Sequence, residues 1–270
     1  MAQFPAPRTG EVIIRARYLA INSGFTTGEV AGEVVDVGAG VGNYAEQDTL
    51  LALNVEYSSI SDSGGYFAAE AIRTIPIANA TPEIVALAGS GITASIVLNE
   101  VAYNAFGNSQ LVLITSAAQG VGHIAVQLAK LAEQRVIGLY KTDEQQKLLL
   151  ELGCDTVVHN ADTAKLPNNI DILFETDGQR CDDCVSHLAM NGQRITVVPQ
   201  TTNTANEFWL PAYYREYGPR HLTQLYELHR AGTIRVMIDP MPFIGAKSIT
   251  DALEYVKRGE NIGQVVVRFD

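Results

Sequence analysis

The pattern of hydrophobic and polar positions changes near residue 100. Before it, short apolar runs with partial alternation are separated by glycine-marked turns, a pattern typical of β-strands. The predicted strands are residues 11–18, 29–38, 50–57 and 65–77. A helix should then begin at Thr81, because this residue can cap it, Pro82 suits its first turn and Glu83 favours its dipole. Residues 1–100 are therefore expected to form a β-rich domain.

Strands and helices alternate from residue 109 onward. The predicted strands are residues 111–115, 135–140, 156–159, 170–175 and 194–198, and the predicted helices are residues 121–131, 143–152 and 181–190. This alternation predicts βαβ units and a parallel sheet, so we expect residues 101–239 to form a doubly wound α/β domain of the Rossmann type. Such a sheet binds its ligands at the carboxyl ends of its strands.

The last part of the chain adds two predicted helices, residues 222–231 and 249–258, and a strand, residues 265–268. We expect the segment from about residue 240 to 270 to return to the first domain. Residues 101–129 lack Asp, Glu, Lys and Arg. Their glycine and polar breaks predict a buried strand, a turn and a helix rather than a membrane span.

Composition and charge narrow the function classes. Hydrophobic residues make up 47% of the 270 residues, which excludes a disordered chain. The formal net charge of −11 makes nucleic acid and anionic membranes poor partners. A small anionic cofactor held by backbone donors remains compatible with this charge.

The chain has three cysteines, Cys154, Cys181 and Cys184. This number is small and odd, which excludes a disulfide framework. It also favours a reducing compartment. Residues 1–9 lack the apolar core of a secretory signal, so we expect a cytoplasmic protein. Cys181 and Cys184 have C-x-x-C spacing, but no second pair completes a zinc site. Two interpretations of this pair stay open. Either the cysteines are simply two helix residues about one turn apart, or they bind a metal or take part in redox chemistry.

The segment from Leu111 to Lys130 holds an apolar strand, a turn of small residues and a helix. Small residues let the backbone approach a pyrophosphate, and the helix N-terminus supplies free N–H groups. The G-x-G-x-x-G spacing is not met, so an ordinary tight turn is the alternative. The next strand and helix follow at the expected distance, which favours a dinucleotide site.

Several segments occur in the order of a known family. They are the turn just described, Glu29-Val-Ala-Gly-Glu-Val-Val-Asp-Val-Gly-Ala-Gly-Val41, Gln47-Asp48, Gly64-Gly-Tyr-Phe-Ala-Ala-Glu70, Gly91-Ile-Thr-Ala94 and Gly259-Glu-Asn-Ile-Gly-Gln-Val-Val266. Together they resemble the medium-chain dehydrogenase/reductase superfamily, in its zinc-free quinone oxidoreductase (zeta-crystallin) and prostaglandin or enone reductase branch. The resemblance implies a GroES-like first domain, a Rossmann domain and a homodimer.

The sequence departs from this family at several positions. The chain is short between Asn22 and Gly28, where the family has a longer loop that reaches the substrate. The family's I-N-P-x-D lacks its Pro and Asp here. In the turn, Ser116 replaces Ala and Gln119 replaces a Gly, whereas Gly122 is retained. The first domain is therefore expected to be shortened, with a more open substrate pocket.

The second strand of the Rossmann domain bears on the choice of cofactor. It ends in Tyr140 and Lys141, without the acidic residue that binds the ribose hydroxyls of NAD. Lys141 can meet a 2′-phosphate, so we expect NADPH. The alternative for Lys141 is a solvated surface charge.

The resemblance also assigns site residues. Cofactor contacts fall on Thr93, Ser116, Ala118, Gln119, Gly120, Val121, Gly122, Tyr140, Lys141, Val198 and Asn261. Asn22 would lie near the nicotinamide. Independently of the resemblance, the first-domain tyrosines Tyr18, Tyr57 and Tyr66 are candidate proton donors, Tyr66 being the one we favour, with protonation by solvent as the alternative. No metal site is expected, because the first domain has neither Cys nor His and His123 lies in the cofactor helix.

The sequence thus predicts an NADPH-dependent oxidoreductase that reduces an activated C=C bond of an enone, or a quinone. Two alternatives stay open. One is a trans-acting enoyl reductase that works on an acyl chain bound to a carrier protein. The other is a catalytically degenerate homologue that binds a cofactor or a partner.

Overall fold

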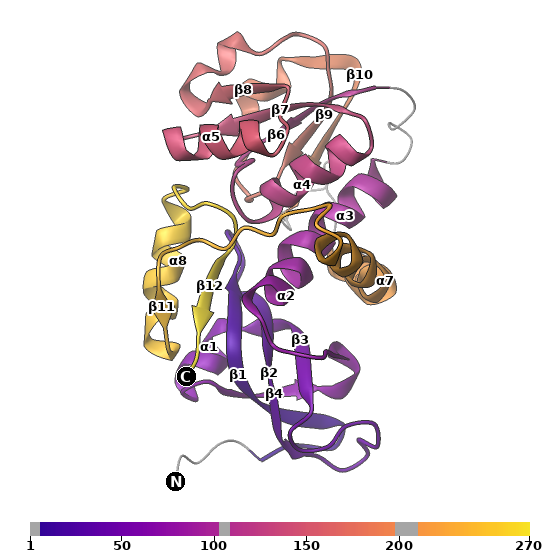
Figure 1. Cartoon of the computed structure of the whole chain (residues 1–270), viewed down its shortest axis with the longest axis vertical. Helices are drawn as coiled ribbons and strands as arrows, with labels where there is room; N and C mark the ends of the chain where they lie inside the picture. Colours follow the sequence, from indigo (N-terminus) through magenta and orange to yellow (C-terminus); the bar gives the residue numbers. More distant parts are fainter. Residues whose placement is uncertain (1–5, 103–108, 198–209) are drawn as a thin grey trace.

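The computed structural model describes residues 6–102, 109–197 and 210–270. Two β-sheets lie at opposite ends of the elongated molecule, and helices lie between them (Figure 1). One sheet is mixed and the other is entirely parallel. The predicted two-part α/β architecture is confirmed.

The mixed sheet is built around β1 (Glu11–Ile21). This strand pairs antiparallel with β2 (Thr27–Val37), β4 (Tyr66–Glu70) and the C-terminal β12 (Val265–Arg268). Outer positions are taken by β3 (Thr49–Glu56), β5 (Thr74–Pro76) and β11 (Phe243–Ile244). The pairing of β12 with β1 brings the C-terminal segment back to this sheet.

Apolar side chains of β1, β2, β3 and β12 form a core beneath the mixed sheet. The short helix α1 (Tyr57–Asp62) and the amphipathic helix α8 (Ile249–Lys257) cover it. In α8 the buried residues Ile249, Ala252 and Val256 recur at the spacing of one helix face. The remaining turns include short 3₁₀ helices at residues 71–73, 160–165 and 246–248.

The parallel sheet has the strand order β10-β9-β6-β7-β8. Its strands are β6 (Leu111–Ile114), β7 (Arg135–Tyr140), β8 (Thr156–His159), β9 (Ile170–Glu175) and β10 (Leu188–Thr196). Helices α4 (Gly120–Leu131) and α5 (Asp143–Glu151) connect the first three. The strand order reverses between β6 and β9, which creates the crevice where such sheets bind ligands.

A continuous helical segment, residues 82–101, lies between the two sheets (Figure 1). It consists of α2 (Pro82–Ala86), a π-helical stretch (Leu87–Gly91), α3 (Ile92–Ile96) and a second π-helical stretch (Val97–Val101). As predicted, Thr81 caps its start by accepting a hydrogen bond from the Ile84 N–H. It is long and apolar enough to cross a membrane, yet 83% of its most apolar window is buried inside the protein. Burial of that kind is characteristic of a core helix.

Three predicted elements differ from the structure. The predicted strand 65–77 is two strands, β4 and β5, separated by the 3₁₀ helix 71–73 and paired with different neighbours. The predicted helix 181–190 is wrong: only α6 (Asp182–Val185) is helical, and β10 begins at Leu188. Gly192 does not end a helix but lies within β10, where a Cβ would meet the Ile170 carbonyl oxygen at 2.7 Å. Helix α7 (Leu210–Arg230) begins well before the predicted residue 222 and contains Pro219.

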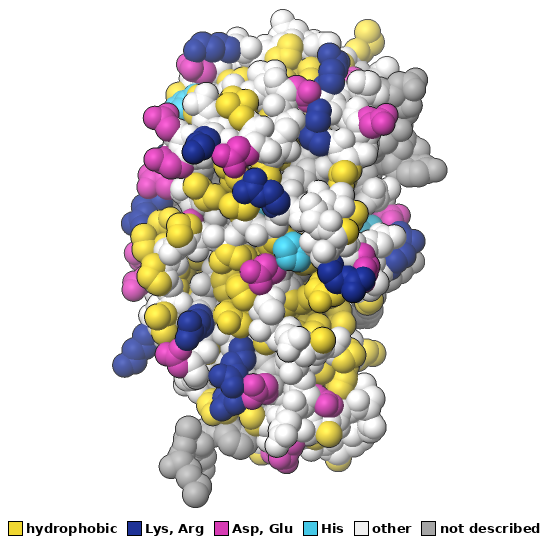
Figure 2. All heavy atoms as spheres, viewed as in Figure 1, with side chains coloured by type: hydrophobic (Ala, Val, Ile, Leu, Met, Phe, Trp, Pro, Cys, Tyr) yellow, Lys and Arg dark blue, Asp and Glu magenta, His cyan; other side chains and the backbone are white. Residues whose placement is uncertain are grey.

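The surface agrees with the acidic composition. On the face shown in Figure 2, acidic and basic side chains are interspersed, and no continuous basic area forms. This face therefore offers no continuous basic track for a phosphate backbone.

Candidate active site

A cleft of about 640 Å³, which includes space open to solvent, lies between the two sheets. It is lined by the carboxyl-end loops of β6 and β9, the helical segment 82–101, the β1–β2 connection and residues 261–265. The cleft therefore lies at the reversal point of the parallel sheet, where a dinucleotide is expected.

The turn between β6 and α4 is tightly folded. Ser116 adopts a left-handed backbone with φ of 44°. A Cβ at Gly122 would lie 2.4 Å from the Ser116 carbonyl oxygen, so only glycine lets α4 start this close to the strand. Gly120 and Val121, at the start of this 12-residue helix, line the cleft. Their position presents the positive end of a helix dipole to an anionic ligand.

The C-terminal segment is bonded directly to this turn. The Gly120 N–H donates to the Gly263 carbonyl at 2.9 Å, and the Gly263 N–H donates to the Ala118 carbonyl at 2.7 Å. The Gln119 amide donates to the Gly259 carbonyl at 2.8 Å. Bonds from Gly259 and Gly263 thus fix the turn to the C-terminal segment, whose residues 261–265 line the cleft and lead into β12 of the mixed sheet.

Asn261 is the clearest sign that the cleft receives a polar ligand. It is 2% exposed and lines the cleft. Its Nδ2 donates to the Gly263 carbonyl at 2.9 Å, whereas its buried Oδ1 accepts no hydrogen bond. An unsatisfied buried acceptor costs free energy unless a ligand supplies the donor. The tight turn, the helix N-terminus and this acceptor fit a dinucleotide cofactor.

The helical segment 82–101 contributes Gly89, Ser90 and Thr93 to the cleft. The Ser90 hydroxyl donates to Gln264 Oε1 at 2.5 Å, and Gln264 Nε2 donates to the Ile21 carbonyl at 2.7 Å. Gly89 and Ser90 belong to the first π-helical stretch, a distortion often found at functional sites. This stretch brings the helix backbone next to the β1–β2 connection.

Lys141 follows β7 at the rim of the parallel sheet. Its Nζ donates to the Arg258 carbonyl at 2.6 Å and lies 3.5 Å from a Glu260 carboxylate oxygen. The Tyr140 ring packs edge-on against His159, with ring centroids 5.4 Å apart. Neither Tyr140 nor Lys141 lines the cleft, although Lys141 contacts the C-terminal segment that does.

Asn22 lies where the cleft meets a second, wider recess of about 1000 Å³. The β1–β2 connection spans only residues 22–26, so the recess opens beside it. The Tyr57 hydroxyl accepts a hydrogen bond from the Asn22 N–H at 2.8 Å. Burial raises the pKa of Tyr57 far above its usual value, so this tyrosine stays neutral and holds the short connection in place.

Glu29 on β2 is a buried carboxyl group in the wall of the cleft. Asn22 Nδ2 donates to its Oε2 at 2.9 Å. The Gly89 backbone packs closely against it, since a Cβ at Gly89 would lie 2.3 Å from the same oxygen. Desolvation raises the pKa of Glu29 to about 7.

Tyr66 does not reach the cleft. It begins β4, opposite Arg15 of β1, and its phenol interacts with the Arg15 guanidinium. The structure therefore separates Tyr66 from the other predicted site residues.

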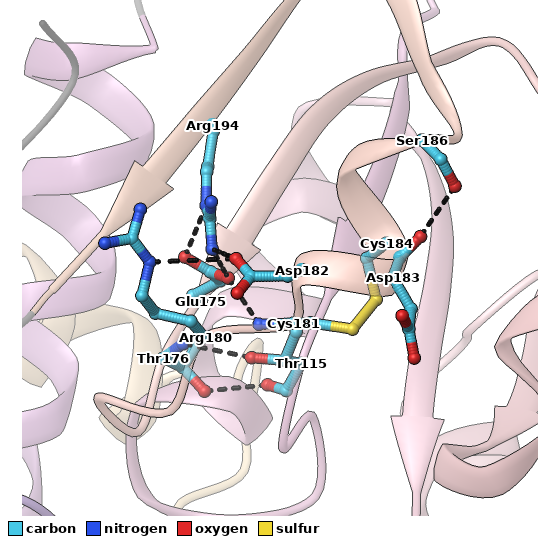
Figure 3. Close-up of a disulfide and its surroundings, with 10 residues drawn as sticks. All are labelled: Thr115, Glu175, Thr176, Arg180, Cys181, Asp182, Asp183, Cys184, Ser186 and Arg194. Atoms are coloured by element: carbon cyan, nitrogen blue, oxygen red, sulfur yellow. Dashed lines mark hydrogen bonds and ion pairs between the residues drawn. A yellow bond between two sulfur atoms is a disulfide. The ribbon is translucent and has the colours of Figure 1, made fainter. Parts of the chain in front are cut away.

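The loop after β9 is held by a second buried carboxylate (Figure 3). Glu175 is 0% exposed and accepts hydrogen bonds from Arg194 at 2.8 Å and from the Cys181 N–H at 2.7 Å. Cys181 and Cys184 form a disulfide, so the expectation of two unbonded helix residues is wrong. The bonds fix the loop that carries Thr176 and Asp177 into the cleft.

Asp177 completes this side of the cleft. Its Oδ2 accepts a hydrogen bond from Ser116 Oγ at 2.6 Å, and its Oδ1 accepts one from the Gln179 N–H at 3.0 Å. Desolvation raises its pKa. The hydroxyl that replaces the family's alanine at Ser116 thus links the two loops at the reversal point.

Within residues 6–102, 109–197 and 210–270, no group of three or more His, Cys, Asp or Glu side chains could hold a metal ion. His123 is fully buried and both of its ring nitrogens are engaged. Its Nδ1 lies 2.6 Å from the Gly120 carbonyl, and its Nε2 accepts the Met237 N–H at 3.1 Å. This histidine fixes the start of α4.

The predicted site residues thus separate into three groups. The cleft is lined by Asn22, Thr93, Gln119, Gly120, Val121 and Asn261. Ser116, Ala118 and Gly122 belong to the turn and fix its backbone, but they do not line the cleft. Tyr66, Tyr140 and Lys141 lie outside the cleft, and Val198 lies outside the described residues.

Sequence reasoning missed Glu29, Ser90, Asp177 and Gln264 as cleft residues. For Glu29 a signal existed, because it is an acidic residue directly before the apolar positions Val30 and Ala31 of a predicted strand. A charged side chain is seldom fully buried without a reason. The other three become visible only when distant segments meet.

Comparison with known proteins agrees with this geometry. The family model of the zinc-binding dehydrogenases matches residues 120–207. A probable quinone oxidoreductase of Leishmania amazonensis is 28% identical, over 96% of this chain and 88% of its own length. Prostaglandin reductase-3 of Mus musculus is 27% identical, over 97% of this chain and 82% of its own length.

Among solved structures, the Escherichia coli quinone oxidoreductase complexed with NADPH matches with a TM-score of 0.81. The identity is 18%, and the match covers 98% of this chain and 93% of that one. The similarity therefore runs through both sheets. The predicted resemblance to the quinone oxidoreductase and prostaglandin reductase-like branch of the medium-chain dehydrogenase/reductase superfamily is therefore confirmed by these similarities.

Proposed function

We propose that this protein is an NADPH-dependent oxidoreductase that reduces the activated C=C bond of an enone, or a quinone. The observation that carries the proposal is the cleft at the reversal point, with its tight turn, its helix N-terminus and the unsatisfied Asn261 Oδ1. Relatives named quinone oxidoreductase and prostaglandin reductase support it. So does a structural neighbour that binds NADPH.

The residues that would hold the cofactor follow from their chemistry. The start of α4 at Gly120 and Val121 offers the positive end of its dipole to the pyrophosphate, although the Gly120 N–H itself is bonded to the Gly263 carbonyl. Asn261 offers a buried acceptor, and Lys141 offers the positive charge that suits a 2′-phosphate. When bound, the reduced nicotinamide supplies the hydride.

The wider recess is the proposed substrate site. It joins the cleft at Asn22, Ser23, Phe25 and Val256. Phe25, Leu253 and Val256 give it apolar surface, and Asn22 and Ser23 add polar groups at the junction. An apolar pocket with a few placed polar groups suits a small carbonyl compound.

The first experiment is a titration with NADPH and NADH that follows nicotinamide fluorescence. We expect tighter binding of NADPH, followed by oxidation of NADPH in the presence of enones or quinones. Absence of binding to either dinucleotide would overturn the proposal. Turnover restricted to an acyl chain on a carrier protein would favour the trans-acting enoyl reductase. Binding without any turnover would favour the degenerate homologue.

A further inference from the structure

Reduction of an enone needs a hydride and a proton, and only the hydride comes from the cofactor. A hydride joins the β-carbon, and the C=C electron pair then forms a new C–H bond at the α-carbon with an incoming proton. A reduced quinone takes its protons on oxygen, where exchange with water is fast. A placed proton donor therefore matters for an enone and not for a quinone.

Among the described residues that line the cleft, two side chains carry a carboxyl group: Glu29 and Asp177. The others are amides, hydroxyls, glycines and apolar groups. Asp177 lies on the cofactor side, where Ser116 and the Gln179 N–H already bond its two oxygens. Glu29 lies on the opposite wall, next to Asn22 at the junction with the recess.

We propose that the carboxyl group of Glu29 is the catalytic proton donor for the α-carbon of an enone substrate. This inference rests on the proposed function and deepens it. It makes Glu29 on β2 the proton donor, a role for which the sequence had indicated Tyr66 or solvent. It also predicts that the two substrate classes depend on this residue to different degrees.

The surroundings of Glu29 keep its carboxyl group protonated. It is 3% exposed, and its bonded neighbour is the Asn22 amide rather than a cation. The groups that face it from other elements are the Tyr57 phenol, which is neutral, and the Gly89 backbone. Because burial raises its pKa to about 7, a large fraction of the carboxyl groups holds a proton at neutral pH.

The proton balance closes with water. The Glu29 carboxyl O–H bond breaks and its proton forms the α C–H bond, while the cofactor is oxidised by loss of a hydride. The resulting carboxylate keeps the hydrogen bond from Asn22 Nδ2. A proton from water restores it through the recess, which is open to solvent beside Asn22 and Ser23.

The test compares Glu29→Gln with Glu33→Gln, a matched change on the same strand. Glu33 does not line the cleft and pairs with Arg15 and Arg17. We expect Glu29→Gln to lower kcat for an enone about 100-fold or more and to leave kcat for a quinone and NADPH binding unchanged. Glu33→Gln should match the parent with both substrates. The retained quinone activity also shows that the variant is folded.

The pH profile and a spectroscopic measurement add independent readouts. The parent's enone rate should fall as pH rises past about 7, and the profile of Glu29→Gln should lose this step. In the protein without cofactor, infrared difference spectra across the same pH range should show a protonated carboxyl band that disappears in Glu29→Gln. Glu33→Gln should keep the band.

Three results would overturn the assignment. They are equal loss of enone and quinone turnover in Glu29→Gln, full enone turnover in that variant, and an unchanged carboxyl band. If the parent protein oxidises NADPH with neither substrate class, the proposed function itself fails. That outcome is distinct, because it appears before any variant is compared.

Discussion

At the scale of single residues, burial without a counter-charge decides the chemistry of the cleft walls. Glu29 and His123 are both desolvated, and in both the neutral form is favoured. Burial raises the pKa of Glu29 to about 7 and lowers that of His123 to about 4. The carboxyl group faces the cleft, whereas the imidazole is closed off by two backbone groups. One can exchange a proton with a ligand and the other only supports the fold.

The raised pKa of Glu29 predicts a pH-dependent change in stability. The pKa of this carboxyl group is 4.5 in the unfolded chain and about 7 in the folded protein. Its contribution to the stability of the folded state is fully present below pH 4.5 and is lost as the pH rises through 7. Glu29→Gln has no such loss. The free energy of unfolding of Glu29→Gln minus that of the parent should therefore rise by about 3 kcal/mol from below pH 4.5 to above pH 7. Urea unfolding at several pH values measures the difference, and a pH-independent difference would contradict the prediction.

Lys141 allows a prediction about cofactor choice. Lys141→Ala should weaken NADPH binding about tenfold, because a charged contact to the 2′-phosphate is lost. NADH binding should not change. Glu260→Gln is the matched control, since it removes the carboxylate 3.5 Å from Lys141 and should leave NADPH binding intact or tighter. Fluorescence titration measures all four combinations, and equal weakening of both dinucleotides would rule out a phosphate contact.

At the scale of elements, the cleft depends on how closely α4, β6 and the π-helical stretch 87–91 approach. Gly122 lets α4 pack on the turn, and Gly89 lets the helical segment pack on Glu29. The backbone bonds between Gly120, Gly263 and Ala118 then join the turn to the C-terminal segment. Close backbone contact, rather than side-chain packing, sets the width of the site.

The turn is tested by Gly122→Ala. Its Cβ would lie 2.4 Å from the Ser116 carbonyl, so the helix start must move. We expect a loss of about 1–3 kcal/mol in the free energy of unfolding and a marked loss of NADPH affinity. Gly42→Ala is the control, because no atom lies within 4 Å of its added Cβ. A Gly122→Ala protein with parent stability and affinity would show that the turn is wider than the structure indicates.

At the scale of the whole molecule, the two sheets are joined by the C-terminal segment and by the buried helical segment 82–101. Within the part of the chain that the structure describes, the parallel sheet has two edge strands, β8 and β10. β10 has a register irregularity between Leu188 and Gln193, and Met190 on it is 100% exposed. An apolar side chain on an open edge strand is suited to pairing with a second copy.

The sequence resemblance implies a homodimer, and we propose that β10 is the edge through which it assembles. Met190→Lys should shift the protein toward monomer, because a charge on an edge strand opposes strand pairing. Met241→Lys is the control, since Met241 is 47% exposed away from the parallel sheet. Sedimentation over a concentration series measures the shift. A parent protein that is monomeric throughout would contradict the proposal.

The sequence by itself determined the elements whose signals are local. β7 and β12 have the predicted bounds, and α4 and α5 begin within one residue of the prediction. Periodicity, caps and glycine-bearing turns act over a few neighbouring residues, so they can be read along the chain. The same signals misassigned residues 181–190, where pairing with β9 overrides local helix preference.

Only the tertiary structure decided which groups meet in the cleft. Asn22, Glu29 and Gly89 come from three elements, and Asn261 reaches the turn from the far end of the chain. Whether a carboxyl group is charged or neutral depends on the solvent and the partners that the fold leaves to it. Burial and partners are properties of the packed molecule, so the role proposed for Glu29 follows from its surroundings and not from its place in a motif.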